Sequence, residues 1–348
     1  MSRLVLLLTS PRVAAGLLCA DAWVALRAGP VFVGDLESPD VEVLTAAGVA
    51  TRLSAAAGSM AIAAELVDAA DETGTVTRWL GADEHATQLA EDVAASLASA
   101  DDTAGIDVDV VCGSWDLPGA RLLDVVATVD RLRSPGGCPW DARQDHQSLA
   151  PYLLEEAYEA FQAIEDADTA GLREEIGDVL FQVAFHARLA EELPAEQRWT
   201  VDDVANGLVD KLRRRHPHVF DGLEVSGEAD VNADWETIKA TERGDASVVS
   251  NVALAAPALT LAATLQRKAA RVGSFDPPAR SLSEPLADFK GMPSAESAGE
   301  LLWATVVEMS SHGIDAEAAL RARARRFRDE VATSDSRGRA ARLPEPAG

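Results

Sequence analysis

The chain has 348 residues, a formal net charge of −26, a pI near 4.5 and 47% hydrophobic residues. This length allows two or three domains with sizeable cores. The negative charge argues against broad binding to nucleic acid or to an anionic membrane, because both attract basic surfaces. The cysteines, Cys19, Cys112 and Cys138, have an odd count and no metal-type spacing, which predicts reduced thiols in a cytoplasmic protein.

Residues 1–119 alternate short apolar runs with alanine-rich stretches of helical character. This alternation predicts a small α/β region with a partly parallel sheet. The first apolar run is too short to span a membrane, and Pro11 and Arg12 interrupt it where a signal peptide would be cleaved, so we expect a strand there. Neither G-x-G-x-x-G nor a P-loop occurs in this region, so no nucleotide chemistry is assigned to it and its role stays unknown.

A helix with apolar residues at helical spacing is predicted from near Ala120 to Arg133. The sequence Ser-Pro-Gly-Gly ends it and opens a polar loop over residues 134–149. Trp140 lies in this loop. Its ring either covers the core or serves as a stacking residue beside a site, since aromatic side chains are used in both ways.

Two helical patterns between Leu153 and Arg188 are joined by a short polar break at residues 165–171. So short a connection predicts antiparallel neighbours. Acidic residues recur in both helices at spacings of three, which puts them on one face of each helix. Carboxylates should therefore meet between the two helices: Glu155, Glu156 and Glu159 from the first, Glu175 and Asp178 from the second.

The second of these helices reads IGDVLFQVAFHA over residues 176–187, apolar on most sides, which predicts that it is buried with Asp178 inside. Clustered buried carboxylates cannot neutralise one another, because like charges raise each other's pKa. A hard divalent cation is the simplest compensation, and carboxylate oxygens without cysteine or histidine favour Mg²⁺ or Mn²⁺ over Zn²⁺. The alternative is a solvated acidic face.

Basic and aromatic residues further along the chain are suited to a phosphorylated ligand. A helix from Val201 to about Arg215 places Lys211 and Arg215 one turn apart on one face, and both side chains bind phosphate well. The alternative is a favourable charge at a helix C-terminus. A helix beginning at Asp234 then presents Trp235 and Lys239 on one face, which suits a base and a phosphate, or simply an amphipathic surface helix.

The last third is predicted to be helical. One helix covers residues 257–273 and ends at Gly273, and two more cover about 296–311 and 315–332. Four prolines predict an irregular segment at 274–294. The tail at 334–348 is predicted to be disordered.

Five phrases together resemble the MazG family of nucleoside triphosphate pyrophosphohydrolases. They are CPWD at 138–141, QSLAPYLLEEAYEA at 147–160, EEIGDVLFQVAFHARLAEE at 174–192, KLRRRHPHVF at 211–220 and DWETIKATER at 234–243. They include the family's E-E-x-x-E and E-x-x-D motifs. The resemblance covers residues 120–245 and implies a mainly α fold: a MazG-type catalytic helical domain that completes a four-helix bundle on dimerisation, preceded here by the small α/β region.

The resemblance also implies an activity: hydrolysis of a nucleoside or deoxynucleoside triphosphate between the α and β phosphates, giving a monophosphate and pyrophosphate. By motif position Glu156, Glu159, Glu175 and Asp178 would hold Mg²⁺, with Glu155 beside them or orienting a water. The residues Lys211, Arg215, Trp235 and Lys239 match substrate-contacting positions. A homodimer is expected, with neither a membrane nor nucleic acid as partner. The competing hypotheses are a regulatory nucleotide-binding module with weak or no turnover, and a structural dimerisation scaffold.

Two departures from the family pattern stand out. Residues 246–333 resemble a second, C-terminal copy of the catalytic region, but Pro285 interrupts its first acidic motif and Ser297 to Glu300 replaces the second. We expect this copy to fold as helices and to be catalytically impaired. Some relatives carry an N-terminal tetrapyrrole methylase domain, for which residues 1–119 are too short and lack a glycine-rich cofactor loop.

Overall fold

The computed structural model describes residues 2–56, 58–81, 84–99, 105–223, 247–271 and 282–340, together with Gly227, Ile238 and Glu242. The chain divides into two compact units, Met1–Val209 and Asp210–Gly348. Across the described residues, no helix is both long and apolar enough to cross a membrane. The division falls inside helix α8 (Val201–Arg215), so the four predicted domain boundaries stay predictions.

The first unit begins with a five-stranded sheet in the order β3-β2-β4-β1-β5, and every pairing in it is parallel. The strands are β1 (Ser2–Thr9), β2 (Val31–Val33), β3 (Thr51–Leu53), β4 (Thr75–Gly81) and β5 (Ile106–Cys112). The first strand lies between β4 and β5 and is largely buried, and the strand predicted from the apolar run at the N-terminus is confirmed. This confirms the small α/β region, with a sheet that is fully rather than partly parallel.

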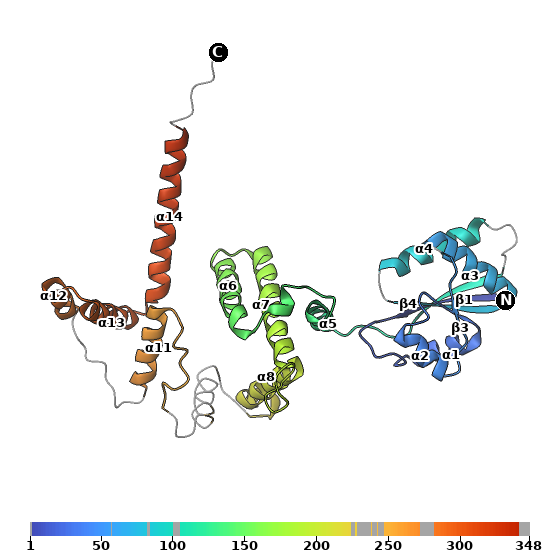
Figure 1. The fold of residues 1–348 in the computed structure, drawn as a ribbon, viewed down its shortest axis with the longest axis horizontal. Coiled ribbons are helices and arrows are strands. Elements are labelled where there is room, and N and C mark those ends of the chain that lie inside the picture. Colours follow the sequence, from blue (N-terminus) through green and yellow to red (C-terminus); the bar gives the residue numbers. More distant parts are fainter. Residues whose placement is uncertain are drawn as a thin grey trace, which may run out of the picture. The chain divides into compact units, whose positions relative to one another are not determined.

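Helices cover both faces of this sheet (Figure 1). They are α1 (Ala20–Ala28), α2 (Pro39–Ala46), α3 (Ser59–Thr73) and α4 (Glu84–Ser99). Successive side chains of a strand point to opposite faces, so Leu6 packs with Leu66 of α3 while Leu7 packs with Leu26 of α1. The result is a three-layer arrangement in which the carboxyl ends of all five strands lie at one edge of the sheet.

A helical part follows in the first unit, built from α5 (Arg121–Arg133), the 3₁₀ turn η1 (Asp141–Arg143), α6 (His146–Glu165), α7 (Thr169–Ala190) and the first part of α8, whereas α9 (Pro217–Phe220) belongs to the second unit. Its core brings Val129 of α5, Leu149 of α6 and Phe185 of α7 together. Arg133 holds the loop before α6 by donating to the carbonyl oxygens of Asp141 at 2.6 Å and Gln144 at 3.1 Å. These contacts fix the loop that leads into α6 against the end of α5.

The turn between α6 and α7 explains why the two helices lie side by side (Figure 1). Ala167 adopts the left-handed backbone conformation, with φ of 54°, and reverses the chain. Asp168 then caps α7 by accepting hydrogen bonds from the backbone N–H groups of Ala170 and Gly171. A Cβ atom at Gly171 would lie 2.7 Å from Asp168 Oδ2, so glycine gives the capping carboxylate its room.

The second unit contains α11 (Ala258–Ala270), α12 (Ser283–Gly291), α13 (Ala295–Ser311) and α14 (Ala316–Ala340). Two predictions for this part are wrong. The segment 274–294 was predicted to be irregular; residues 274–281 lie outside the described chain, but residues 283–291 form a helix, because Pro285 falls in the first turn, where its missing N–H has no intrahelical acceptor. Helix α14 also continues beyond Ser334 to Ala340, where Gly338 and Asp335 do not interrupt it; residues 341–348 lie outside the described chain.

Candidate functional site

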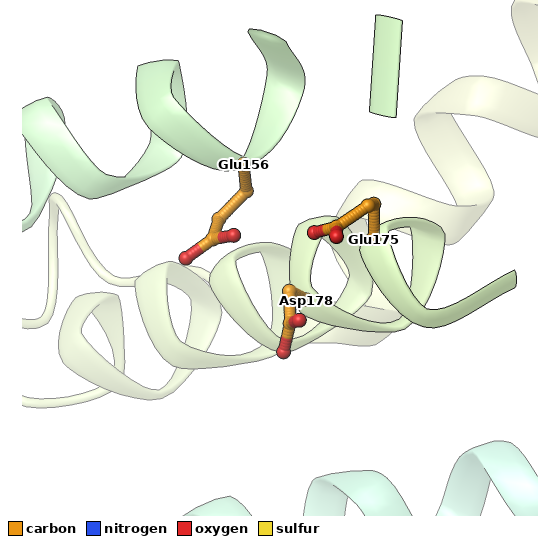
Figure 2. A group of neighbouring side chains, drawn as sticks. All are labelled: Glu156, Glu175 and Asp178. Atoms are coloured by element: carbon orange, nitrogen blue, oxygen red, sulfur yellow. The ribbon is translucent and has the colours of Figure 1, made fainter. Parts of the chain in front are cut away.

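Three carboxylates converge between α6 and α7. Glu156 projects from α6 toward Glu175 and Asp178, which lie one turn apart on α7 (Figure 2). Each side chain offers an oxygen, and these three oxygens all lie within 4.8 Å of one another. The convergence follows from the helical spacing on α7 and from the short capped turn that places α6 alongside it.

The crowding of these carboxylates changes their acidity. The pKa of Glu156 is raised above its usual 4.5, first by burial and then by the negative charges of Asp178, Glu159, Glu175 and Glu155. The pKa of Glu175 is raised as well, first by burial and then by Glu159, Asp178 and Glu174. Ionisation of these carboxylates is therefore unfavourable in the folded chain, and binding of a proton or a cation would reduce the repulsion between them.

The remaining predicted ligands flank this group. Glu159 is exposed and lies outside the set of three, although it is near enough to raise the pKa values of both Glu156 and Glu175. Glu155 is exposed too, and acts on Glu156 through its charge. The structure thus brings three of the five predicted acids together and places the other two beside them.

One argument from sequence is wrong for the chain as described: α7 is not buried on most sides. Asp178 is exposed, and so are the apolar side chains of Ile176 (53% of its surface) and Val183 (38%). The physical reason is that α5 and α6 cover only part of the circumference of α7. The apolar residues on its free side therefore lie open in this chain.

The donor set at the three carboxylates fits a hard divalent cation. Only oxygen ligands converge there, which is the chemistry that Mg²⁺ and Mn²⁺ prefer. In the part of the chain that the structure describes, no other group of three or more metal-ligating side chains comes together in this way. An acidic cluster fitted to a cation is thus present where the sequence predicted one.

The predicted phosphate-binding residues lie near the end of α8. Lys211 is exposed, whereas Arg215 is half-buried and pairs with Glu242, with 2.7 Å between Nη2 and Oε2. Arg214 joins the same carboxylate at 2.7 Å. The hydrogen bonds from the two guanidinium groups lower the pKa of Glu242 to about 2. Trp235 and Lys239 lie outside the described residues.

Sequence reasoning missed Glu242 and the histidine pair His146 and His186. Glu242 is part of the phrase DWETIKATER. An acidic residue that follows the basic cluster at residues 211–215 was the sequence feature that could have predicted its ion pairs. The Nδ1 atoms of His146 and His186 lie 2.8 Å apart, and the ring of Trp199 stacks on His146. No sequence signal predicts this pair, because 40 residues separate its members.

Trp140 is 43% exposed and packs edge to face on Tyr152, so it does not cover the core.

Residues 246–333, which were predicted to be a second copy of the catalytic region, have different side chains where the second acidic motif would fall. Ser297, which stands where the E-x-x-D motif would begin, forms a capping box with Ser294 at the start of α13. Asp288, Glu296 and Glu300 line a nearby cavity of about 520 Å³. Within the described residues they do not form a group of three converging carboxylates.

Known proteins resemble this chain over the same region. The MazG nucleotide pyrophosphohydrolase domain matches residues 144–220. An uncharacterised 26.1 kDa protein of Streptomyces cacaoi is 43% identical over 230 residues, which are 66% of this chain and 88% of that protein. The nucleoside triphosphate pyrophosphohydrolase/pyrophosphatase MazG of Thermotoga maritima is 39% identical over 220 residues, which are 60% of this chain and 83% of that protein.

A solved MazG-related protein from Thermotoga maritima is 26% identical and aligns with a TM-score of 0.29, covering 34% of this chain and 96% of that one. That score is too low to support a fold assignment. The identity and coverage of the sequence relatives, together with the domain match over α6, α7 and α8, show that this chain belongs to the MazG family of nucleotide pyrophosphohydrolases.

Proposed function

We propose that the α6–α7 hairpin hydrolyses nucleoside or deoxynucleoside triphosphates between the α and β phosphates, releasing a nucleoside monophosphate and pyrophosphate. The observation that carries this proposal is the convergence of Glu156, Glu175 and Asp178 inside the matched MazG domain. The related enzyme of Thermotoga maritima bears that activity in its name. Membership of the same family makes it the best supported function for this chain.

The carboxylates are the proposed holders of Mg²⁺, with Mn²⁺ as a substitute. Glu156, Glu175 and Asp178 supply converging oxygens, and Glu159 stands beside them as the fourth ligand. A divalent cation bound there would offset phosphate charge and lower the pKa of a bound water. Glu155, on the same helix and at the edge of the group, is placed to orient the attacking water or to take its proton.

Substrate recognition falls to the basic and aromatic residues. Lys211 and Arg215 carry positive charge for the phosphates, and Trp235 and Lys239 complete the proposed set for the base and the remaining phosphate. In the described structure Arg215 is held by Glu242. A triphosphate that engages Arg215 therefore competes with, or binds beside, this carboxylate.

A homodimer is the proposed assembly. Apolar side chains lie exposed along α6 and α7, on helices that would be expected to bury them. They include Tyr152, Leu153, Leu154, Tyr158, Phe161, Ile164, Ile176 and Val183. Burial of this surface against the same surface of a second copy would complete a four-helix bundle.

Two further inferences from the sequence stay predictions. They are the cytoplasmic location predicted from the cysteines and the catalytic impairment of residues 246–333.

A product analysis tests the activity. The purified chain is incubated with a panel of nucleoside and deoxynucleoside triphosphates and Mg²⁺, and the products are separated by anion exchange. We expect monophosphate and pyrophosphate in equal amounts from at least one substrate. Diphosphate with inorganic phosphate would contradict the cleavage position. Tight binding of nucleotide that is recovered unchanged would favour the regulatory module instead.

A further inference from the structure

A cavity of about 610 Å³ lies in the N-terminal α/β region, at the carboxyl edge of its sheet. Its walls include Thr9 at the end of β1, Gly34 just after β2, Arg78 in β4 and Ser59 at the start of α3. None of the residues of the acidic cluster lines it. In open parallel α/β sheets, ligands bind in crevices at this edge.

Arg78 is the unusual residue of this cavity. It is only 8% exposed, and its Nε and Nη1 atoms are buried without a hydrogen-bond partner among the described residues. Glu65 supports its charge electrostatically, but the Glu65 carboxylate accepts hydrogen bonds from Ser54 Oγ and the Ala55 backbone N–H. A buried guanidinium with free donors is costly unless an anion completes its surroundings.

The start of α3 presents further donors to the same cavity. Gly58 precedes the helix with φ of 89°, and no side chain caps the first turn. The hydroxyl group of Ser59 is buried and has no partner in the described part of the chain. A helix N-terminus carries free backbone N–H groups and a partial positive charge, which favour an anion. Two independent features of the cavity therefore call for negative charge.

The walls of the cavity also contain acidic side chains. Asp35 and Asp40 line the cavity, and burial raises the pKa of Asp40. Ile62, Trp79 and Leu89 add apolar surface. A ligand that is anionic throughout would be repelled by the aspartates, whereas one with an anionic end and hydroxyl or amino groups elsewhere would satisfy both kinds of wall.

We propose that this cavity binds a small phosphorylated molecule that carries hydroxyl groups. The phosphate would lie against Arg78, Ser59 and the N-terminus of α3, and the hydroxyl groups would donate to Asp35 and Asp40. A phosphate fits better than a carboxylate, because a guanidinium, a hydroxyl and helix N–H groups offer donors to three oxygens rather than two. The cavity gives residues 1–119 a binding role that is separate from the α6–α7 hairpin.

Calorimetry on the full chain tests this proposal. Ribose 5-phosphate is titrated in the presence of EDTA, so that no divalent cation can recruit phosphate to the acidic cluster. Ribose tests the need for the phosphate, and citrate tests for a carboxylate ligand. We expect ribose 5-phosphate to bind with one-to-one stoichiometry, and ribose and citrate to bind at least about tenfold more weakly.

Variants assign the binding to the cavity. Arg78→Met should weaken ribose 5-phosphate binding by about tenfold or more, and Ser59→Ala by several-fold, because each removes a donor to the phosphate. Asp178→Asn is the control in the acidic cluster and should leave this binding unchanged. Ser59→Ala is a small change at a helix start, so it tests the site even if Arg78→Met does not fold.

The outcomes are decisive in both directions. No binding of ribose 5-phosphate to the wild-type chain at millimolar concentration would overturn the proposal. Equal binding by the wild type and by both cavity variants would also overturn it, since the phosphate would then lie elsewhere. Citrate binding as tight as that of ribose 5-phosphate would replace the phosphate with a carboxylate ligand and contradict the assignment made here.

Discussion

Glu156 of α6 and Asp178 of α7 each place a carboxylate oxygen within 4.8 Å of the other and of an oxygen of Glu175. Figure 2 shows the three side chains where the two helices are neighbours, with Glu156 directed from α6 toward α7. Asp178 is the strongest of the charges that raise the pKa of Glu156. The short capped turn between α6 and α7 thus holds negatively charged side chains close together. In the unfolded chain the same side chains would move apart. A cation bound between them would reduce this repulsion.

Loss of one carboxylate should remove the proposed activity without loss of the fold. We expect Glu156→Gln and Asp178→Asn each to lower kcat/KM for triphosphate hydrolysis by about a hundredfold or more, because each removes a cation ligand that is charged. Circular dichroism and the melting temperature should show a folded protein. Glu196→Gln makes the same change of charge at an exposed residue outside the cluster and should keep full activity.

The contribution of Glu156 and Glu175 to the stability of the metal-free chain should fall as the pH rises from about 4.5. The folded-state pKa values of Glu156 and Glu175 are raised above 4.5, so above that pH the folded state binds more protons than the unfolded state. Their contribution to the free energy of unfolding then decreases with pH until both groups have ionised in the folded state. Carboxylates with lowered pKa, such as Glu242 at about 2, change stability at lower pH and in the opposite direction.

Melting curves in EDTA at several pH values check this expectation. Glu156→Gln should flatten the decline, because one of the raised groups no longer titrates. Mg²⁺ should raise the melting temperature most at the upper end of the range, where the carboxylates are ionised and free to bind it. A decline of the same slope in the variant would show that Glu156 is not its source.

The exposed apolar surface of α6 should be a dimer contact. We expect the wild-type chain to sediment as a dimer, and Leu154→Asp to shift the equilibrium toward the monomer, because an unpaired carboxylate would be buried in the contact. Val24→Asp places the same charge on an exposed apolar residue of α1 and serves as the matched control. A wild-type monomer at micromolar concentration would contradict the assembly.

The basic residues near the end of α8 should act on substrate affinity. Lys211→Met and Arg215→Met are expected to raise KM by about tenfold, since each removes a charged contact to phosphate that contributes about 1.4 kcal/mol. Arg213→Met removes a neighbouring charge that points to another side of the helix and should change KM little. Equal effects of all three substitutions would indicate a general charge effect, which would also weaken with salt.

Much of this architecture can be predicted from the sequence, because its signals are local. The three-residue spacing of Glu175 and Asp178 and the short break before Thr169 predict a helical hairpin with facing acids. The alternation of apolar runs with alanine-rich stretches predicts the α/β region. Turn chemistry such as the Asp168 cap needs only neighbours within three residues.

The features that sequence could not supply depend on distant contacts. The pattern of apolar residues in α7 shows which sides of the helix are apolar, but it does not show whether this chain or another one covers them. Ile176 and Asp178 were therefore predicted to be buried, and in the structure both are exposed. Arg78 is one arginine within a strand, and only the fold brings it to the start of α3. The same holds for the pairing of His146 with His186.

A crystal soaked in Mn²⁺ gives the most direct test of the central claim, through an anomalous difference map at the manganese edge. The account predicts a peak between the carboxylates of Glu156, Glu175 and Asp178, and none there in a crystal of Asp178→Asn. Density at other surface acids with none between these three side chains would contradict it.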